Sequence, residues 1–217
     1  MTEPAAESLS EVLKRHAIDL PDDQIEHLDH YCRALWEWNE KINLTRHTTY
    51  EKFVARDVID SMALESFLDS GERIMDVGTG GGVPGIVLAI VRPDLKVTLA
   101  ESVGKKSKAV EDIVRQLGLK VPVVAGRAES ILDTKQFDTL VVRAVAPLTK
   151  LLTWFAPHWD SFHQLLIIKG PAWVEERGDA RHRGLMNDLQ LRKIAEYPMH
   201  GTDSMSVILQ VKRPETE

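Results

Sequence analysis

One glycine-rich segment constrains the fold more than any other part of the chain: Asp76-Val77-Gly78-Thr79-Gly80-Gly81-Gly82-Val83-Pro84-Gly85. It follows an apolar run, residues 73–77, and leads into a second apolar run that begins near Pro84. Glycines let the backbone approach a ligand closely, and the free N–H groups at the start of a helix attract an anionic group. The segment therefore predicts a loop that binds a nucleotide-like cofactor between a buried strand and a helix. The alternative is a glycine-rich turn without a ligand.

Short β-rich runs alternate with helical runs from residue 70 onward. The runs typical of strands are residues 73–77, 96–101, 121–125, 137–143 and 164–169, followed by 190–198 and 205–212, which a hairpin at Gly201-Thr202-Asp203 would join. This alternation predicts a mostly parallel sheet with helices on both faces. In such a sheet, ligands bind at the carboxyl ends of the strands, where the glycine-rich segment lies.

The front of the chain has helical periodicity instead. Pro21 suits the first turn of one helix, and Thr48 with Glu51 forms a possible capping box for another. We therefore expect an N-terminal helical extension, residues 1–69, packed on a core domain, residues 70–217.

Composition restricts the kind of protein further. The only cysteine, Cys32, excludes an intrachain disulfide, and no Cys/His cluster has the spacing of a metal site, so we expect no metal. The chain has no signal-peptide pattern and no apolar run of about 20 residues, which predicts a cytoplasmic protein without a membrane span. The net charge of −6 arises in residues 1–70, where 15 Asp and Glu outnumber 7 Lys and Arg. It therefore does not argue against a nucleic-acid partner for the rest of the chain.

Two carboxylates help to choose between possible cofactors. Through Gly80, Gly82 and Gly85 the loop also fits the dinucleotide pattern, so the glycines alone leave both NAD and S-adenosylmethionine open. Asp76 precedes these glycines, where it would face an amino group directly or through water. Glu101 ends the second strand, where a carboxylate accepts hydrogen bonds from both ribose hydroxyls. This order favours S-adenosylmethionine, and NAD remains the alternative.

Motifs outside the loop carry a more specific resemblance. The chain resembles the bacterial ribosomal small-subunit RNA methyltransferase G family, also called glucose-inhibited division protein B, from about residue 9 to 213. The resemblance rests on Trp38-Asn39, Asn43-Leu44-Thr45, Asp60-Ser61, Asp76 to Gly80, Pro84-Gly85, Glu101-Ser102, Lys105-Lys106, Arg127 to Glu129, Arg143-Ala144 and Lys169-Gly170. One departure is Arg56-Asp57, because many relatives have Arg-His at these positions.

The resemblance implies a class I S-adenosylmethionine-dependent methyltransferase, with a Rossmann-like sheet of seven mostly parallel strands whose last strand is antiparallel. It also implies methylation of guanine N7 in a loop of 16S rRNA near the decoding site. We expect a monomer that acts on the RNA or on a small-subunit particle. By position, it implies a cofactor site formed by Gly78 and Val83 in the loop, by Ala128 and Glu129 beside the adenine, and by Arg143, which closes the pocket. From the loop itself we also expect Gly80 and Gly82 to bind the cofactor.

The chemistry implied by the resemblance needs few catalytic groups. Guanine N7 keeps an in-plane lone pair at neutral pH, so no general base has to remove a proton before methyl transfer. The work is then to position two reactants in line. We expect Arg143 and Lys169, at strand ends beside the site, to contribute to this positioning. The alternative is a structural role, for example an ion pair of Arg143 with Asp76 or Glu129.

Basic residues are the candidates for RNA contact. Lys105, Lys106 and Arg127 follow strands on the ligand side of the sheet, although exposed lysines are usually only solvated. Arg181 and Arg183 lie in the segment 173–188, whose two glycines predict a weak helix that either becomes ordered on RNA or is an ordinary surface helix. For Trp36 and Trp38, packing against the core domain is a better prediction than base stacking.

Three other functions stay open from the residues alone. The first is methylation of a different substrate with the same cofactor. The second is an NAD-binding oxidoreductase, and the third is a protein of the same fold that binds RNA without catalysis.

Overall fold

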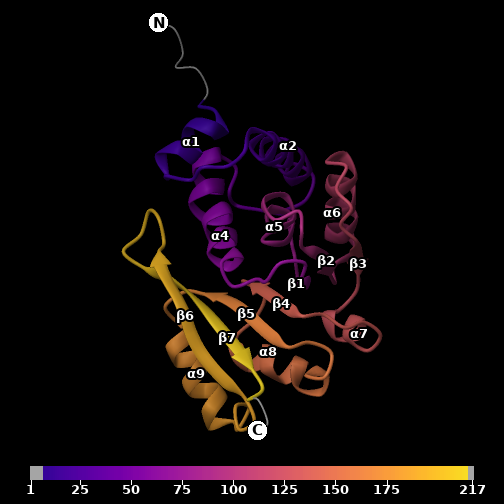
Figure 1. Ribbon diagram of the computed structural model, residues 1–217, viewed down its shortest axis with the longest axis vertical. Coiled ribbons are helices and arrows are strands. Elements are labelled where there is room, and N and C mark those ends of the chain that lie inside the picture. Colours follow the sequence, from indigo (N-terminus) through magenta and orange to yellow (C-terminus); the bar gives the residue numbers. More distant parts are fainter. Residues whose placement is uncertain (1–6, 215–217) are drawn as a thin grey trace, which may run out of the picture.

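The computed structural model describes residues 7–214 and contains one seven-stranded sheet with helices on both faces (Figure 1). The strands lie in the order β3-β2-β1-β4-β5-β7-β6. Only β7 runs in the opposite direction to the other six strands, and this confirms the predicted fold class. The strands are β1 Arg73–Val77, β2 Lys96–Glu101, β3 Val123–Ala125, β4 Thr139–Arg143, β5 Gln164–Lys169, β6 Gln190–Pro198 and β7 Met205–Lys212.

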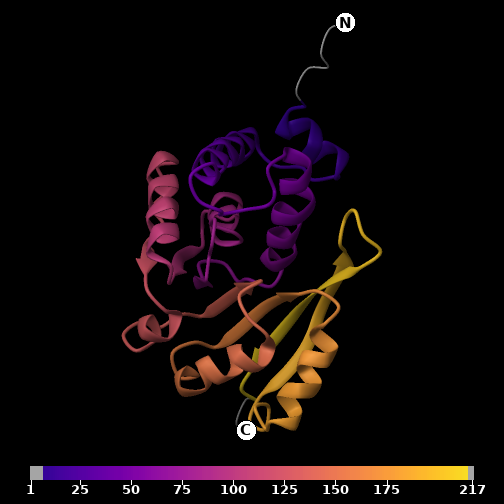
Figure 2. The same cartoon turned by 180° about the vertical axis from the view of Figure 1, so that it is seen from behind.

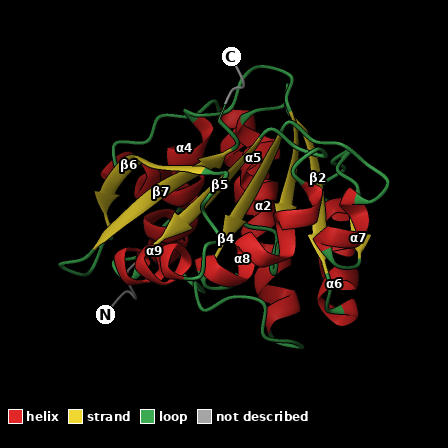
Figure 3. Ribbon diagram, turned by 90° about the horizontal axis from the view of Figure 1, so that it is seen from below, coloured by secondary structure: helices red, strands yellow, loops and turns green. Residues whose placement is uncertain are grey.

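Helices fill both sides of the sheet, as the view from below shows (Figure 3). They are α1 Leu9–Arg15, α2 Asp22–Asn39, α3 Tyr50–Lys52, the π-helix η1 Phe53–Val58, α4 Ile59–Glu65, α5 Gly85–Val91, α6 Gly104–Gln116, α7 Ala128–Leu132, α8 Leu148–Phe155, the 3-10 helix η2 Ala156–His158 and α9 Trp173–His182. None of the helices among residues 7–214 is long and apolar enough to cross a membrane.

Three helix boundaries differ from the sequence prediction. Pro21 is the residue before α2 rather than part of its first turn. The cap of the next helix is Thr49, whose side chain accepts a hydrogen bond from the Lys52 N–H, and not Thr48. Helix α9 ends before Gly184, which has a φ of 68°, so the segment that follows is not helical.

The alternation of side chains along the strands creates two cores. Ile74 of β1 belongs to the apolar cluster beneath α5 and α6, while Met75 and Val77 belong to the cluster beneath α7 and α8. Successive residues of a strand point to opposite faces, and both faces here are covered, which explains why the strands are almost continuously apolar.

The N-terminal helices cover the same face of the sheet as α5 and α6. Leu28 and Leu35 of α2 and Phe53 of η1 are fully buried in one cluster with Ile86 and Leu88 of α5. Seen from behind, these helices lie together above the sheet, whereas α8 and α9 cover its other face (Figure 2). Helices before β1 therefore complete the layer that supports the glycine-rich loop. The division at residue 69 into extension and core domain remains a prediction, and the few residues beyond each end of 7–214 lie outside the described part.

Candidate functional site

Asp76 fixes the conformation of the glycine-rich loop. Its Oδ2 accepts hydrogen bonds from the Thr79 hydroxyl at 2.6 Å and from the Gly85 N–H at 2.9 Å, so one carboxylate joins the end of β1 to the start of α5. The side chain is buried, and burial raises the pKa of Asp76 to about 6, although these two hydrogen bonds act in the opposite direction. Its other oxygen, Oδ1, is buried without a hydrogen-bond partner among the described residues.

The loop needs glycine at several positions for separate reasons. Gly78, Gly80 and Gly82 have φ values of 65°, 62° and 108°, a region that side-chain-bearing residues rarely adopt. A β-carbon at Gly78 would also lie 2.8 Å from Val145 Cγ2. The backbone of Gly78 is consequently in close contact with the residues that follow β4.

A cavity lies at the carboxyl ends of β1 to β4, beside Gly78. Gly78, Ala128, Glu129 and Arg127, all predicted from the sequence, are part of its lining. The complete lining is Val77, Gly78, Ala100, Ser102, Gly126, Arg127, Ala128, Glu129, Val145 and Trp154. Most of these residues follow directly after a strand, as expected for a doubly wound sheet. Trp154 of α8, Val145 and Ser102 were not predicted as site residues. Of these three, only Ser102 could have been found from its neighbours in the sequence, because it follows Glu101.

Other predicted cofactor residues lie around this lining rather than in it. Glu101 Oε2 accepts a hydrogen bond from the Gly80 N–H at 3.0 Å, and its Oε1 accepts one from the Val103 N–H at 2.8 Å. Glu101 therefore supports the loop from the end of β2. Gly82 is buried, and Val83 is packed in the apolar core under α5, so neither lines the cavity. Direct contact of these residues, and of Asp76, with a cofactor stays a prediction.

Arg143 ends β4 and forms ion pairs with two buried carboxylates. Its Nη1 lies 2.7 Å from Asp57 Oδ1 and 3.2 Å from Asp60 Oδ2. Burial alone would lower the pKa of Arg143, but the two carboxylates raise it above its ordinary value. The suggested partners Asp76 and Glu129 were wrong, because the sequence does not reveal that η1 and α4 pass across the end of β4.

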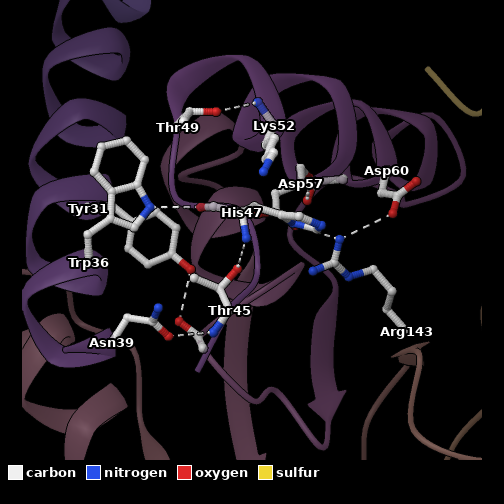
Figure 4. A network of polar contacts seen from close by, with 12 residues as sticks. Tyr31, Trp36, Asn39, Thr45, His47, Thr49, Lys52, Asp57, Asp60 and Arg143 are labelled. Atoms are coloured by element: carbon white, nitrogen blue, oxygen red, sulfur yellow. Dashed lines mark hydrogen bonds and ion pairs between the residues drawn. The ribbon is translucent and has the colours of Figure 1, made fainter. Parts of the chain in front are cut away.

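The two carboxylates have further partners of their own. His47 Nδ1 is hydrogen-bonded to Asp57 Oδ1 at 2.9 Å, and the Tyr197 hydroxyl donates to Asp60 Oδ1 at 2.8 Å. Figure 4 shows His47, Asp57, Asp60 and Arg143 side by side. Position 57, the departure from the family pattern in the sequence analysis, thus holds a carboxylate that pairs with a histidine ten residues earlier.

Lys169, the other predicted positioning residue, is also paired. Its Nζ donates to the Ala146 carbonyl oxygen at 2.7 Å and lies 2.7 Å from Glu176 Oε2. Glu176 in turn accepts a hydrogen bond from the Leu148 N–H at 2.7 Å. Lys169 and Glu176 together hold the connection between β4 and α8, which includes the cavity residue Val145.

The predicted RNA-contact residues fall into two separate groups. Lys105 and Lys106 lie in the first turn of α6, close after Ser102, and Arg127 is in the cavity lining. Arg181 and Arg183 lie at the end of α9, on the other side of the molecule from α6 and α7 (Figure 1). Of these predicted RNA-contact residues, only Arg127 lines the cavity, and Lys105 and Lys106 lie a few residues after its lining residue Ser102.

Trp38 contacts the core domain, as predicted, whereas Trp36 makes its hydrogen bond within the N-terminal segment. Trp36 Nε1 donates to the His47 carbonyl oxygen at 2.8 Å, and Trp38 Nε1 donates to Asp112 Oδ2 in α6 at 2.9 Å. Within residues 7–214, no group of three or more His, Cys, Asp and Glu side chains is arranged to hold a metal ion.

Solved structures share this fold. The TrmK protein of M. capricolum in complex with S-adenosyl-homocysteine matches with a TM-score of 0.56 and 11% identity, over 71% of this chain and 67% of that one. The human methyltransferase 10 domain containing protein matches with a TM-score of 0.57 and 12% identity, over 86% and 97%. The strand order and these matches define the fold of the chain as that of class I methyltransferases.

Sequence comparison identifies the family within this class. The family model described as rRNA small subunit methyltransferase G matches residues 24–200. Relatives named Ribosomal RNA small subunit methyltransferase G include one from Rhodopirellula baltica, 48% identical over 86% of this chain and 81% of its own length. Another, from Thermoanaerobacter sp. strain X514, is 34% identical over 98% and 92%. The chain belongs to the rRNA small subunit methyltransferase G family, which confirms the predicted S-adenosylmethionine-dependent methyltransferase of ribosomal RNA.

Proposed function

We propose that this enzyme transfers a methyl group from S-adenosylmethionine to N7 of a guanine in 16S rRNA, and that it acts as a monomer in the cytoplasm. The observation that carries the proposal is the cavity between Gly78 and Ala128-Glu129, in a chain of this family. The guanine and its N7 atom come from the family resemblance, and the cavity supplies a place for the methyl donor.

The residues around the cavity fit this cofactor. The wall at Gly78 is backbone only, because a β-carbon there would meet Val145. Ala100, Gly126 and Ala128 leave room for a flat base, and Glu129 and Ser102 offer polar atoms at its edge. In this arrangement, Ala128 and Glu129 would hold the adenine and Glu101 the ribose. The unpartnered, buried Oδ1 of Asp76 is an acceptor suited to a donor such as the ammonium group.

The protein's contribution to the reaction is binding and orientation. When bound, S-adenosylmethionine supplies an electrophilic methyl group on a positively charged sulfur. Guanine N7 presents its lone pair without losing a proton, so no side chain has to act as a base. The loop from Gly78 to Gly82 and the segment after Arg143 fix the two sides of the cavity, which places the reactants in line. Arg127 lines the cavity, Lys105 and Lys106 follow its lining residue Ser102 in the first turn of α6, and all three would bind RNA phosphates.

The test is methylation of unmethylated 16S rRNA, both free and in small-subunit particles, with labelled S-adenosylmethionine. Label should appear as N7-methylguanine at one position, located by cleavage of the RNA at the methylated base. Label at another atom or in another RNA would overturn the proposal, as would absence of label from both forms. The matched variants are Glu129→Ala, which removes a cavity side chain and should weaken transfer, and Glu111→Ala, an exposed position on α6 that should not.

Cofactor choice and oligomeric state need separate measurements. A ligand at 100 times its dissociation constant stabilises a protein by about 2.7 kcal/mol. S-adenosylmethionine should therefore raise the melting temperature, and NADH should not. Sedimentation should give the mass of one chain, 24.4 kDa. A larger particle at working concentration would contradict the monomer.

A further inference from the structure

Five polar side chains from distant parts of the chain meet in one row at the end of β4. The row runs from Tyr197 on β6 through Asp60, Arg143 and Asp57 to His47, in the loop after α2. Its role in the enzyme rests on the proposed function, because it concerns how Arg143 reaches the cofactor.

The guanidinium of Arg143 is held through one of its three nitrogen atoms, Nη1. Both carboxylates pair with Nη1, and no described residue partners Nε or Nη2. Arg143 also lies two residues before Val145, which packs on Gly78 and lines the cavity. The Arg143 guanidinium therefore lies at the carboxyl end of β4, outside the cavity lining itself, with donors that no described residue uses.

Burial makes the row rigid. The Asp57 and Asp60 side chains are 1% and 5% exposed and that of Arg143 is 19% exposed. A flexible arginine side chain loses rotamer freedom when it is held in one place, and the two carboxylates offset this cost. Asp57 lies in the π-helix η1, a type of helical turn frequent at functional sites.

Tyr197 and His47 complete the row without reaching the cavity. Each makes a hydrogen bond to one of the carboxylates, and neither belongs to the cavity lining. A carboxylate with a second partner holds its orientation better than one with the guanidinium alone, as second-layer partners do for other ligand-binding groups. Tyr197 and His47 thus fix the orientation of Asp60 and Asp57, and these two carboxylates fix the position of the Arg143 guanidinium.

We propose that Tyr197 and His47 are positioning residues for cofactor binding, which act through Asp60 and Asp57 to present the free N–H groups of Arg143 to the bound S-adenosylmethionine. The hairpin strand β6 and the loop after α2 thereby both contribute to a site that they do not touch.

The experiment measures the affinity for S-adenosyl-homocysteine by calorimetry in four variants of the full chain. Tyr197→Phe and His47→Ala should raise the dissociation constant about tenfold, which is about 1.4 kcal/mol. The matched controls are Tyr50→Phe, whose hydroxyl donates to Asp29, and His16→Ala, whose ring contacts Glu51 at 2.8 Å. Like the contacts under test, one control contact joins Tyr to Asp and the other joins His to a carboxylate, but neither involves a cavity residue. Both control variants should therefore bind S-adenosyl-homocysteine as tightly as the unsubstituted chain.

Additional measurements separate positioning from simple loss of folding. The calorimetric stoichiometry reports the folded fraction, while the dissociation constant reports the site in the folded molecules. His47→Gln keeps an N–H donor for Asp57 and should restore most of the affinity. In methylation assays the Tyr197→Phe enzyme should show a raised KM for S-adenosylmethionine with kcat retained at saturation.

Two results would overturn the inference. The first is a dissociation constant for Tyr197→Phe and His47→Ala equal to that of the unsubstituted chain. The second is an equal weakening by the controls at Tyr50 and His16. If the unsubstituted chain binds and methylates normally in either case, only the positioning role fails. If it does not bind the cofactor product at all, the proposed function fails as well.

Discussion

The hydroxyl of Tyr31 in α2 donates a buried hydrogen bond of 2.9 Å to the carbonyl oxygen of Gly81 in the glycine-rich loop. Leu35 and Leu44 also lie close to this glycine, since a β-carbon there would be 3.0 Å from Leu35 Cδ1 and 3.5 Å from the Leu44 carbonyl oxygen. The side-chain oxygen of Asn39 fixes the backbone of the loop that contains Leu44, because it accepts hydrogen bonds from the N–H groups of Leu44 and Thr45. The shape of the loop thus depends on helices that precede the sheet.

Removal of residues 1–69 should prevent cooperative folding of residues 70–217. The truncated chain would expose the faces of Ile86 and Leu88 that the N-terminal helices bury. Urea unfolding followed by circular dichroism should show no sharp transition, and a dye for exposed apolar surface should bind. The control is Tyr31→Phe in the full chain, which should still unfold cooperatively with a loss of about 1 to 3 kcal/mol. A truncated chain that unfolds cooperatively and binds S-adenosyl-homocysteine would show that residues 70–217 are an autonomous domain.

Gly85→Ala should destabilise the protein, whereas Gly104→Ala should not. A β-carbon at Gly85 would lie 2.2 Å from Leu99 Cδ2 and 2.9 Å from Asp76 Cβ, both in the buried layer between α5 and the sheet. We expect a loss of about 1 to 3 kcal/mol from this overpacking. Gly104 begins α6 with open space around it, so alanine there should be neutral or stabilising by a few tenths of a kcal/mol. Equal unfolding free energies for the two variants, measured in urea, would contradict the role of Gly85.

Asp76 should make the stability depend on pH. Burial raises its pKa from 3.8 to about 6 in the folded protein. Between these values the folded chain retains a proton that the unfolded chain has released, so the free energy of unfolding falls as the pH rises. The full difference is about 3 kcal/mol.

Asp76→Asn isolates this contribution from all other titrating groups. The amide keeps an oxygen for Thr79 and Gly85 but carries no titrating proton. The stability of the unsubstituted protein relative to Asp76→Asn should decrease from pH 4 to pH 7, as measured by urea unfolding at each pH. A constant difference would show that burial of the carboxyl group has no such effect.

Glu176 should matter more for stability than its neighbour Glu175. Glu176→Ala leaves the Leu148 N–H without its acceptor and Lys169 without its ion pair, and a lost buried partner costs about 1 to 3 kcal/mol. Glu175 is exposed on the same helix, so Glu175→Ala should change the unfolding free energy by less than about 0.5 kcal/mol. Similar values for the two variants would mean that the contact with the β4–α8 connection contributes little.

Sequence information was sufficient for features that depend on local chemistry. Positive φ angles strongly favour glycine, which is why Gly78, Gly80 and Gly82 revealed the loop. Alternating runs of strand and helix revealed the sheet. The residues after β3, Ala128 and Glu129, were found through the resemblance to the family and do lie at the cavity.

Contacts between distant segments could not be found in this way. Whether Arg143 pairs with Asp57, Asp60 or Asp76 depends on how η1 and α4 cross the sheet, and no local pattern encodes that crossing. The same holds for Tyr197, which reaches Asp60 from a strand 137 residues later, and for Trp154, whose helix brings it to the cavity. The departure at position 57 was visible in the sequence, but its partner His47 was not.

The position of β7 has a consequence for the synthesis of the chain. Because β7 lies between β5 and β6, β6 has no place in the sheet until residues 205–212 are available. Tyr197 on β6 therefore comes to Asp60 only after nearly the whole chain has been translated. The contact between Tyr197 and Asp60 is therefore among the last features of the fold to form during synthesis.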